Sequence, residues 1–173
     1  HGLYISDVKE INTKGGSIRV VTSKNKHLED TDVILRYIRE ETVYGKPSTF
    51  NDLARLNEQV SHDIISIINS MSNHELSIIG YGASATSTVL TEKLGIGDLL
   101  SFVVDDNIQR QKCLSPNNYL PIHDINNIRS VKGKIIVIIL AWRFSVDIIQ
   151  KLRSLDKEIT VVVPLPNPRI VQL

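Results

Sequence analysis

An apolar run with no alternation, Ile135–Leu140, most restricts the folds open to this chain. A strand with one face in water alternates apolar and polar residues, whereas a strand covered on both faces is apolar throughout. The run is also far too short to span a bilayer, which takes about 20 apolar residues in a helix. The sequence therefore predicts a central strand of a parallel sheet with helices on both of its faces.

Strand and helix patterns alternate around this run. Short apolar stretches predict further strands at 76–79, 102–104 and 159–163. Apolar residues at helical spacing predict helices over 85–94, ended by Gly95, and over 146–152, on Val146, Ile149 and Leu152. Strands that alternate with helices form right-handed βαβ units. We therefore expect an α/β fold in residues 74–173, a Rossmann-like doubly wound parallel sheet.

Two segments precede this predicted domain. In residues 1–25, apolar side chains flank Asn12–Gly16, where paired glycines can take the positive φ angles of a tight hairpin. An isolated hairpin is only marginally stable, so we expect it to belong to a larger sheet upstream. Residues 26–73 predict two helices on either side of a break at Gly45–Pro47. We interpret this segment as bridging helices, and Ser48, Thr49 and Asn51 are the candidate caps of the second.

Composition narrows the classes of partner and compartment. The chain has 173 residues and one cysteine, Cys113, which excludes an internal disulfide framework and favours a reducing compartment. Its net charge is +1 with the two signs interspersed, so we expect no nucleic-acid partner. No apolar stretch or signal peptide indicates a membrane, and we expect a cytoplasmic protein. The start at His1 without a methionine suggests an excised fragment.

The loop after the first predicted strand, Gly80–Ala85, fits the pattern G-x-G-x-x-A and opens a predicted helix. Glycines let the backbone turn sharply and approach a ligand, and a helix N-terminus offers N–H groups to an anion. Asp105 ends the next strand, where an acidic residue often binds a ribose hydroxyl. Two interpretations stay open. The loop binds a nucleotide through Gly80, Gly82, Ala83, Ser84 and Asp105, or it is a tight turn in which Ser84 caps the helix and Asp105 is solvated.

Other polar residues fall near the same predicted edge of the sheet. Trp142 follows the central strand, where open α/β sheets place ligands, although the sequence favours a packing role under a loop over a ligand contact. Arg110 and Arg143 are candidates to bring positive charge to a diphosphate at that edge. Neighbouring Asp105 and Asp106 point apart in an extended segment, so we expect a solvated pair and no catalytic dyad. For the Asp124 carboxylate we expect a cap of the helix that follows it.

Several segments of the chain occur in the same order as in one known family. Gly2–Leu3, Val8–Ile11 and Gly15–Val20 look like a hairpin that closes the catalytic domain of that family, and Gly80–Ala85 looks like the start of its C-terminal domain. Other matching positions are Asp105, Asn107, Gln111, Pro116, Pro121, Ile122, Ala141–Trp142 and Pro164–Pro166. The chain thus resembles the S-adenosylmethionine-dependent C-methyltransferases of nucleotide-linked deoxysugars. It departs from their pattern at Arg110, Lys112, Asn117–Asn118 and Arg143.

The resemblance implies a parent enzyme that methylates a carbon of a nucleotide-linked sugar. A base removes a proton next to a carbonyl, and the enolate attacks the methyl group of S-adenosylmethionine. In this family the donor site, the zinc-binding cysteines and the acid–base residues lie upstream of the hairpin, so the resemblance implies no catalytic residue, metal or cofactor in this chain and an inactive fragment. The implied partner is the upstream catalytic domain.

The role implied for residues 74–173 is to complete the substrate cleft or to brace the catalytic domain. The candidate substrate-binding residues are Gly80, Gly82, Ala83, Ser84, Asp105, Asn107, Arg110, Trp142 and Arg143. Two alternatives remain: a dinucleotide-binding module of an oxidoreductase, supported by the glycine loop and Asp105, and a purely structural Rossmann-like domain.

Overall fold

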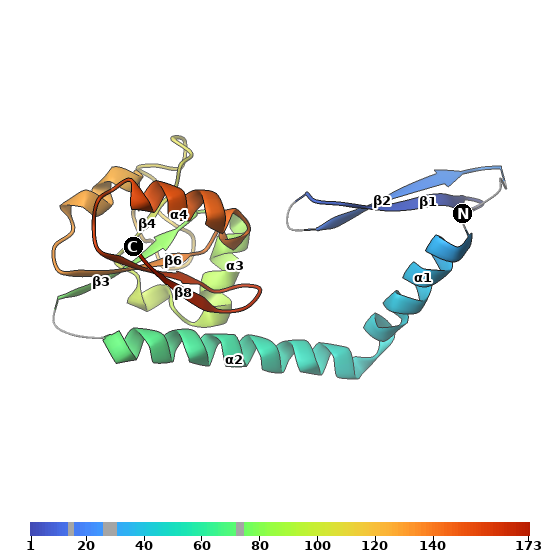
Figure 1. The fold of residues 1–173 in the computed structure, drawn as a ribbon, viewed down its shortest axis with the longest axis horizontal. Helices are drawn as coiled ribbons and strands as arrows, with labels where there is room; N and C mark the ends of the chain where they lie inside the picture. The colour runs from blue at the N-terminus through green and yellow to red at the C-terminus, as the bar shows by residue number, and fades with distance from the viewer. Residues whose placement is uncertain (14–15, 26–30, 72–74) are drawn as a thin grey trace. The chain divides into compact units, whose positions relative to one another are not determined.

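A computed structural model describes residues 1–13, 16–25, 31–71 and 75–173 of the chain (Figure 1). They form two compact units, His1–Ala54 and Arg55–Leu173. The functional division at residues 25 and 73 stays a prediction. Within the described ranges, no helix has the length and apolar character needed to cross a membrane.

The first unit contains the predicted hairpin. Strands β1 (Tyr4–Ile11) and β2 (Ser17–Ser23) pair antiparallel, and Gly16 takes a φ of 117° beside the turn. Gly15, the other glycine of the predicted pair, lies outside the described residues. Helix α1 (Thr31–Glu41), the short helix η1 (Thr42–Gly45) and the start of α2 (Pro47–Met71) complete the unit. The hairpin forms a sheet of its own and does not extend the larger sheet.

The capping prediction for α2 is wrong. The helix begins at Pro47, so Ser48, Thr49 and Asn51 all lie inside its first turns. Proline favours the first helical position because it has no N–H to leave unpaired there and its φ is already helical. Thr49 instead donates its hydroxyl to the carbonyl of Val43. A proline at the start of a helix therefore sets the boundary more strongly than a following polar side chain.

The second unit contains a six-stranded sheet with the order β5-β4-β3-β6-β7-β8. Its strands are β3 (Leu76–Tyr81), β4 (Phe102–Val104), β5 (Ile122–His123), β6 (Lys134–Ile139), β7 (Ile159–Val163) and β8 (Arg169–Gln172). All neighbours are parallel except β7 and β8. The wholly parallel sheet that the sequence predicted is wrong at this edge. Residues 164–168 are too few for the crossover that a parallel pair requires, so the chain turns back antiparallel.

Strand β6 occupies the centre of the sheet beside β3, as predicted. Its side chains alternate between two cores. Ile136 and Ile138 join the core formed with α2 and α3 (Ala85–Leu94), whereas Ile135, Val137 and Ile139 join the core formed with α4 (Ser145–Arg153). After the exposed Lys134, every residue of β6 is buried on one face or the other, which explains the continuous apolar run from Ile135. The doubly wound Rossmann-like fold is confirmed, with α3 and α4 on its two faces (Figure 1).

The local signals at the helix ends are largely confirmed. The Ser84 hydroxyl caps α3 by accepting from the N–H of Ser87, and Gly95 ends α3 with a φ of 63°. Asp124 caps the short helix η3 (Ile125–Ser130) by accepting from the N–H of Asn126. The apolar stripe predicted for α4 is partly wrong, because Val146 is 65% exposed and Ile148 and Leu152 are the buried residues. Val146 lies two residues before Ile148, about 200° around the helix, so it points away from the face that Ile148 and Leu152 bury.

The burial of β6 predicts a large cost for removing volume from it. Ile138 is fully buried, and Ile138→Ala should lower the free energy of unfolding by about 2–5 kcal/mol through lost burial and a residual cavity. Val146→Ala, at an exposed position on α4, is the control and should change it by less than about 0.5 kcal/mol. Urea unfolding followed by circular dichroism measures both. Equal midpoints for Ile138→Ala and the unaltered chain would contradict two-sided burial.

Candidate functional site

The chain reverses its direction across the sheet between β3 and β6. From β3 it runs through α3 to β4 and β5 on one side, and it then returns to β6 on the other side of β3. In doubly wound sheets a crevice forms at the carboxyl ends of the strands where this reversal occurs. A pocket of about 310 Å³ lies there, between the loops that follow β3, β4 and β6. Its lining includes six predicted site residues: Gly82, Ser84, Asp105, Arg110, Trp142 and Arg143.

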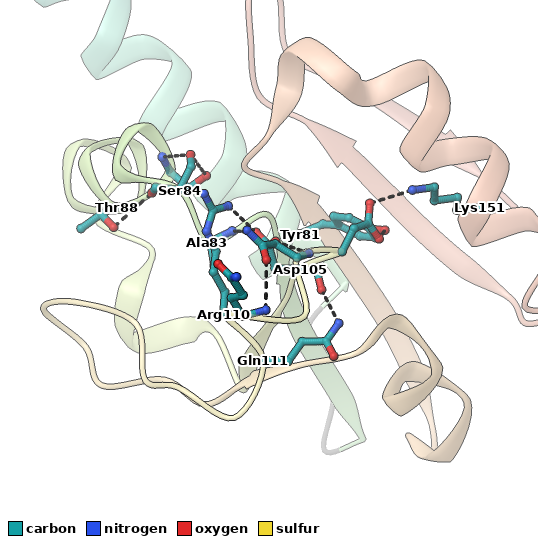
Figure 2. Close-up of polar contacts among 12 residues, drawn as sticks. Tyr81, Ala83, Ser84, Thr88, Asp105, Arg110, Gln111 and Lys151 are labelled. Atoms are coloured by element: carbon teal, nitrogen blue, oxygen red, sulfur yellow. Dashed lines mark hydrogen bonds and ion pairs between the residues drawn. The ribbon is translucent and has the colours of Figure 1, made fainter.

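The Asp105 carboxylate ties the glycine loop to the loop after β4. Its Oδ2 atom accepts from the N–H of Ala83 at 2.6 Å and from Arg110 Nη1 at 3.2 Å, and its Oδ1 atom accepts from the N–H of Asn107 at 2.8 Å. The Asp105 carbonyl accepts from Gln111 Nε2 at 2.9 Å. Figure 2 shows Asp105 among Ala83, Arg110 and Gln111. The side chain is only 8% exposed, so the expectation that Asp105 is solvated is wrong.

This arrangement changes what the glycine loop can bind. In a dinucleotide site, the acidic residue after the second strand binds ribose hydroxyls and the helix N-terminus binds a diphosphate. Here the acidic residue takes the Ala83 N–H group itself, and Ser84 Oγ accepts from the N–H of Ser87 at 3.2 Å. The Ala83 N–H group that could bind a phosphate is therefore already hydrogen-bonded to a carboxylate of the chain. Of the two interpretations of the loop, the capping role of Ser84 is present in the structure.

The glycines of the loop have packing reasons. Gly82 has a φ of 107°, and a Cβ atom on it would lie 2.6 Å from the Cβ of Ala141. Gly80 lies within β3, where an added Cβ would meet Leu140 Cδ1 at 2.9 Å. Two backbone hydrogen bonds close the same region, from Gly82 N–H to the Val104 carbonyl and from Ala141 N–H to the Tyr81 carbonyl. Close approach of β3 and β6 thus accounts for both glycines without a ligand.

A second carboxylate, Asp106, is held by two donors at the other side of the pocket. Tyr81 donates its hydroxyl to Asp106 Oδ1 at 2.8 Å, and Lys151 of α4 donates to Oδ2 at 2.7 Å (Figure 2). Burial raises the pKa of the Tyr81 phenol, and its hydrogen bond to Asp106 raises it further. Burial also raises the pKa of Asp106, but the hydrogen bonds from Lys151 and Tyr81 outweigh burial and leave it lowered. Asp106 is therefore an ionised, partnered carboxylate that is still about half exposed, so the expectation of a solvated pair is wrong for Asp105 alone.

The third side of the pocket is aromatic and cationic. Residues Trp142–Phe144 form the short helix η4 after β6, and Trp142 and Phe144 both line the pocket. Trp142 also packs against both cores, so its predicted packing role and its place in the pocket are both observed. The guanidinium of Arg143 lies 5.0 Å from the centre of the Trp142 ring, and it has no hydrogen bond or ion pair with another residue that the structure describes. Its N–H donors are thus available to a ligand.

The remaining predicted residues lie beside the pocket. Ala83 lines a small neighbouring hollow of about 20 Å³, and Asn107 shapes the loop by accepting from the N–H of Gln109. Sequence reasoning missed Tyr81, Asp106, Phe144 and Lys151 as lining residues. Sequence spacing gave no usable signal for Lys151, because its position four residues after Asp147 predicts an ion pair along α4, whereas the structure pairs Lys151 with Asp106. In residues 1–13, 16–25, 31–71 and 75–173, no group of three or more His, Cys, Asp or Glu side chains could hold a metal ion.

The buried carboxylate yields a stability prediction. Asp105→Ala leaves the N–H groups of Ala83 and Asn107 without their acceptor, and each should cost about 1–3 kcal/mol of unfolding free energy if left unsatisfied. Asp147→Ala removes the same charge from an exposed position in the pocket lining and should cost less than about 1 kcal/mol. Thermal and urea unfolding provide the comparison. Similar losses in the two variants would contradict the anchoring role of Asp105.

Comparison with known proteins assigns the chain to a family. The family model described as the C-methyltransferase C-terminal domain matches residues 12–166, which is most of the chain. No curated protein matches the chain. The match begins just after β1 and ends in the segment between β7 and β8, so it includes every residue that lines the pocket.

Proposed function

Because the chain belongs to the C-methyltransferase C-terminal domain family, we propose that it forms part of an S-adenosylmethionine-dependent methyltransferase and that its pocket holds the nucleotide part of a nucleotide-linked sugar. The observation that carries this proposal is the side of the pocket made by Trp142, Arg143 and Phe144. Aromatic rings offer a base a stacking surface, and a guanidinium with unused N–H donors offers a phosphate charge-assisted hydrogen bonds. One ligand that combines both groups is a nucleoside diphosphate.

The size and position of the pocket support the same ligand class. Its volume of about 310 Å³ is at the lower end of small-molecule sites, so it suits part of a nucleotide-linked sugar and leaves the sugar outside. The Arg143 side chain is exposed, as expected for a residue that meets a ligand at a rim. We propose that the sugar projects from the pocket toward a catalytic domain that carries the donor and the acid–base residues.

The described residues do not fit the methyl donor or a zinc ion. The Ala83 N–H group and the Asp105 carboxylate, which a nucleoside at this loop would need, are bonded to each other. Among the described side chains, no three or more His, Cys, Asp or Glu residues form a group that could hold a metal ion, and Cys113 is the sole cysteine of the sequence. The donor supplies the methyl group, so we propose that it binds another domain, while the residues of this pocket bind and orient the acceptor.

The hairpin unit supports a partner domain. Leu3, Tyr4, Ile18, Val20 and Val21 are all between 43% and 54% exposed on the two strands and the residue before them. Two-stranded hairpins are only marginally stable by themselves, so apolar side chains of this number favour a larger sheet or core around them. We propose that the catalytic domain of the same enzyme provides it.

The oxidoreductase alternative has less support. It rests on the glycine loop and Asp105, but Asp105 is buried and accepts three hydrogen bonds from the chain itself. A ribose would have to displace these donors, at a cost of about 1–3 kcal/mol for each one left unsatisfied. The purely structural alternative gives the pocket no ligand, and the binding experiment below separates it from our proposal.

Removing the free guanidinium should weaken diphosphate binding. We expect the 173-residue chain to bind uridine 5′-diphosphate more tightly than uridine, and Arg143→Ala should reduce the diphosphate affinity by about 1.5–3 kcal/mol because a charge-assisted hydrogen bond is lost. Arg153→Ala, which removes the same charge from α4 outside the pocket lining, is the matched control. Titration calorimetry measures both. Diphosphate binding that is absent, or equal in the two variants, contradicts the proposal.

Donor and dinucleotide binding should both be absent from this chain. S-adenosylmethionine and NAD each need an acidic side chain or the N–H groups of the glycine loop. In this chain the Asp105 carboxylate and the Ala83 N–H group are already hydrogen-bonded to each other. Calorimetry at 25 °C with each compound should show no saturable heat. Stoichiometric binding of S-adenosylmethionine would overturn the assignment of the donor to another domain, and stoichiometric binding of NAD would favour the oxidoreductase alternative.

A further inference from the structure

The charges in the pocket balance each other. Three cations line it, Arg110, Arg143 and Lys151, together with three carboxylates, Asp105, Asp106 and Asp147. Arg110 is paired with Asp105, and Lys151 is paired with Asp106. A diphosphate carries more than one negative charge, so Arg143 alone leaves it undercompensated. A second cation must therefore change its partner when such a ligand binds.

The two ion pairs differ in how easily they can open. The Asp105 carboxylate is 8% exposed and also accepts from two backbone N–H groups, so loss of Arg110 would leave a buried charge short of a partner. The Lys151 and Asp106 side chains are 50% and 48% exposed. Ion pairs in contact with water contribute little, because each partner is solvated when they separate. Lys151 is the cation that can be released at small cost.

The Asp106 carboxylate keeps a donor after such a release. Tyr81 bonds to Oδ1, whereas Lys151 bonds to Oδ2, so the two donors occupy different oxygen atoms. Tyr81 is buried in β3, so its phenol is held in place by the strand. The Lys151 ammonium group is at the end of a long, flexible side chain on α4. Only the lysine side of the contact can therefore move toward a ligand.

We propose that Lys151 is the second phosphate-binding cation of this pocket and that Asp106 holds it in the free protein. On binding, the Lys151 ammonium leaves Asp106 Oδ2 for a phosphate oxygen, and Tyr81 retains Asp106. This inference rests on the proposed nucleotide site and adds the residue that discriminates for the diphosphate. A neutral nucleoside gains nothing from the exchange, so Lys151 selects for the charged part of the ligand.

Two substitutions with opposite expected signs test the exchange. Lys151→Met should weaken binding of uridine 5′-diphosphate by about tenfold and leave binding of uridine unchanged. Asp106→Asn keeps an acceptor for Tyr81 but frees Lys151, and it should tighten diphosphate binding about two- to fivefold. Circular dichroism and thermal unfolding confirm that each variant is folded. Weaker binding by Asp106→Asn would overturn the proposal, because it would place Asp106 in direct contact with the ligand.

A matched control separates the exchange from a simple charge effect. Asp147→Asn removes the same charge from the same pocket, but Asp147 has no hydrogen bond or ion pair within the described part of the chain. With Lys151 present, Asp106→Asn should increase the affinity for uridine 5′-diphosphate more than Asp147→Asn does. When Lys151→Met is also present, the increase from Asp106→Asn should fall to that from Asp147→Asn. An Asp106→Asn gain that is independent of Lys151 would refute the exchange.

The failures of the two proposals are distinguishable. If neither the unaltered chain nor Asp106→Asn binds uridine 5′-diphosphate, the proposed nucleotide site is wrong and the exchange fails with it. If the unaltered chain binds the diphosphate and Arg143→Ala weakens it, but Lys151→Met does not, the site stands and only the role of Lys151 is refuted.

Discussion

The contact between the Asp105 carboxylate and the Ala83 N–H group is the interaction on which the site depends. It joins the loop after β3 to the end of β4, and Arg110 and Asn107 attach the following loop to the same carboxylate. In a Rossmann-like sheet these are the two elements that normally close around a nucleotide. Because a carboxylate of the chain fills that place, the loop is tied to the end of β4 by the chain itself, and the open space lies instead toward α4.

The position of the open space follows from the packing of the central strand. The side chains of β6 are buried on both faces, so no ligand can enter between the sheet and its helices. The pocket lies at the carboxyl ends of the strands, where the close approach of Gly82 to Ala141 fills the space between β3 and β6. The residues after Ala141 are the first that can turn outward, which is why Trp142, Arg143 and Phe144 form one side of the pocket.

The sequence contained enough information for the scaffold but less for the site. Continuous burial of 135–140, the G-x-G-x-x-A loop and the cap at Ser84 were readable because each depends on local chemistry or on one simple period. The antiparallel β8 was missed because its direction depends on a short connection, and the start of α2 was missed because proline overrode the polar candidates. Asp105 was read as solvated, since its three donors come from residues 83, 107 and 110 and only the folded chain brings them together.

The pair Asp105 and Asp106 shows why neighbouring identical residues acquire different roles. Their side chains point in opposite directions from the end of β4, as an extended backbone requires. One meets backbone N–H groups and a guanidinium and becomes buried, while the other meets a phenol and an ammonium at the rim. Burial makes the first contact costly to break, and exposure to water makes the second exchangeable. The same residue type therefore supplies a fixed anchor on one side of the pocket and a replaceable partner on the other.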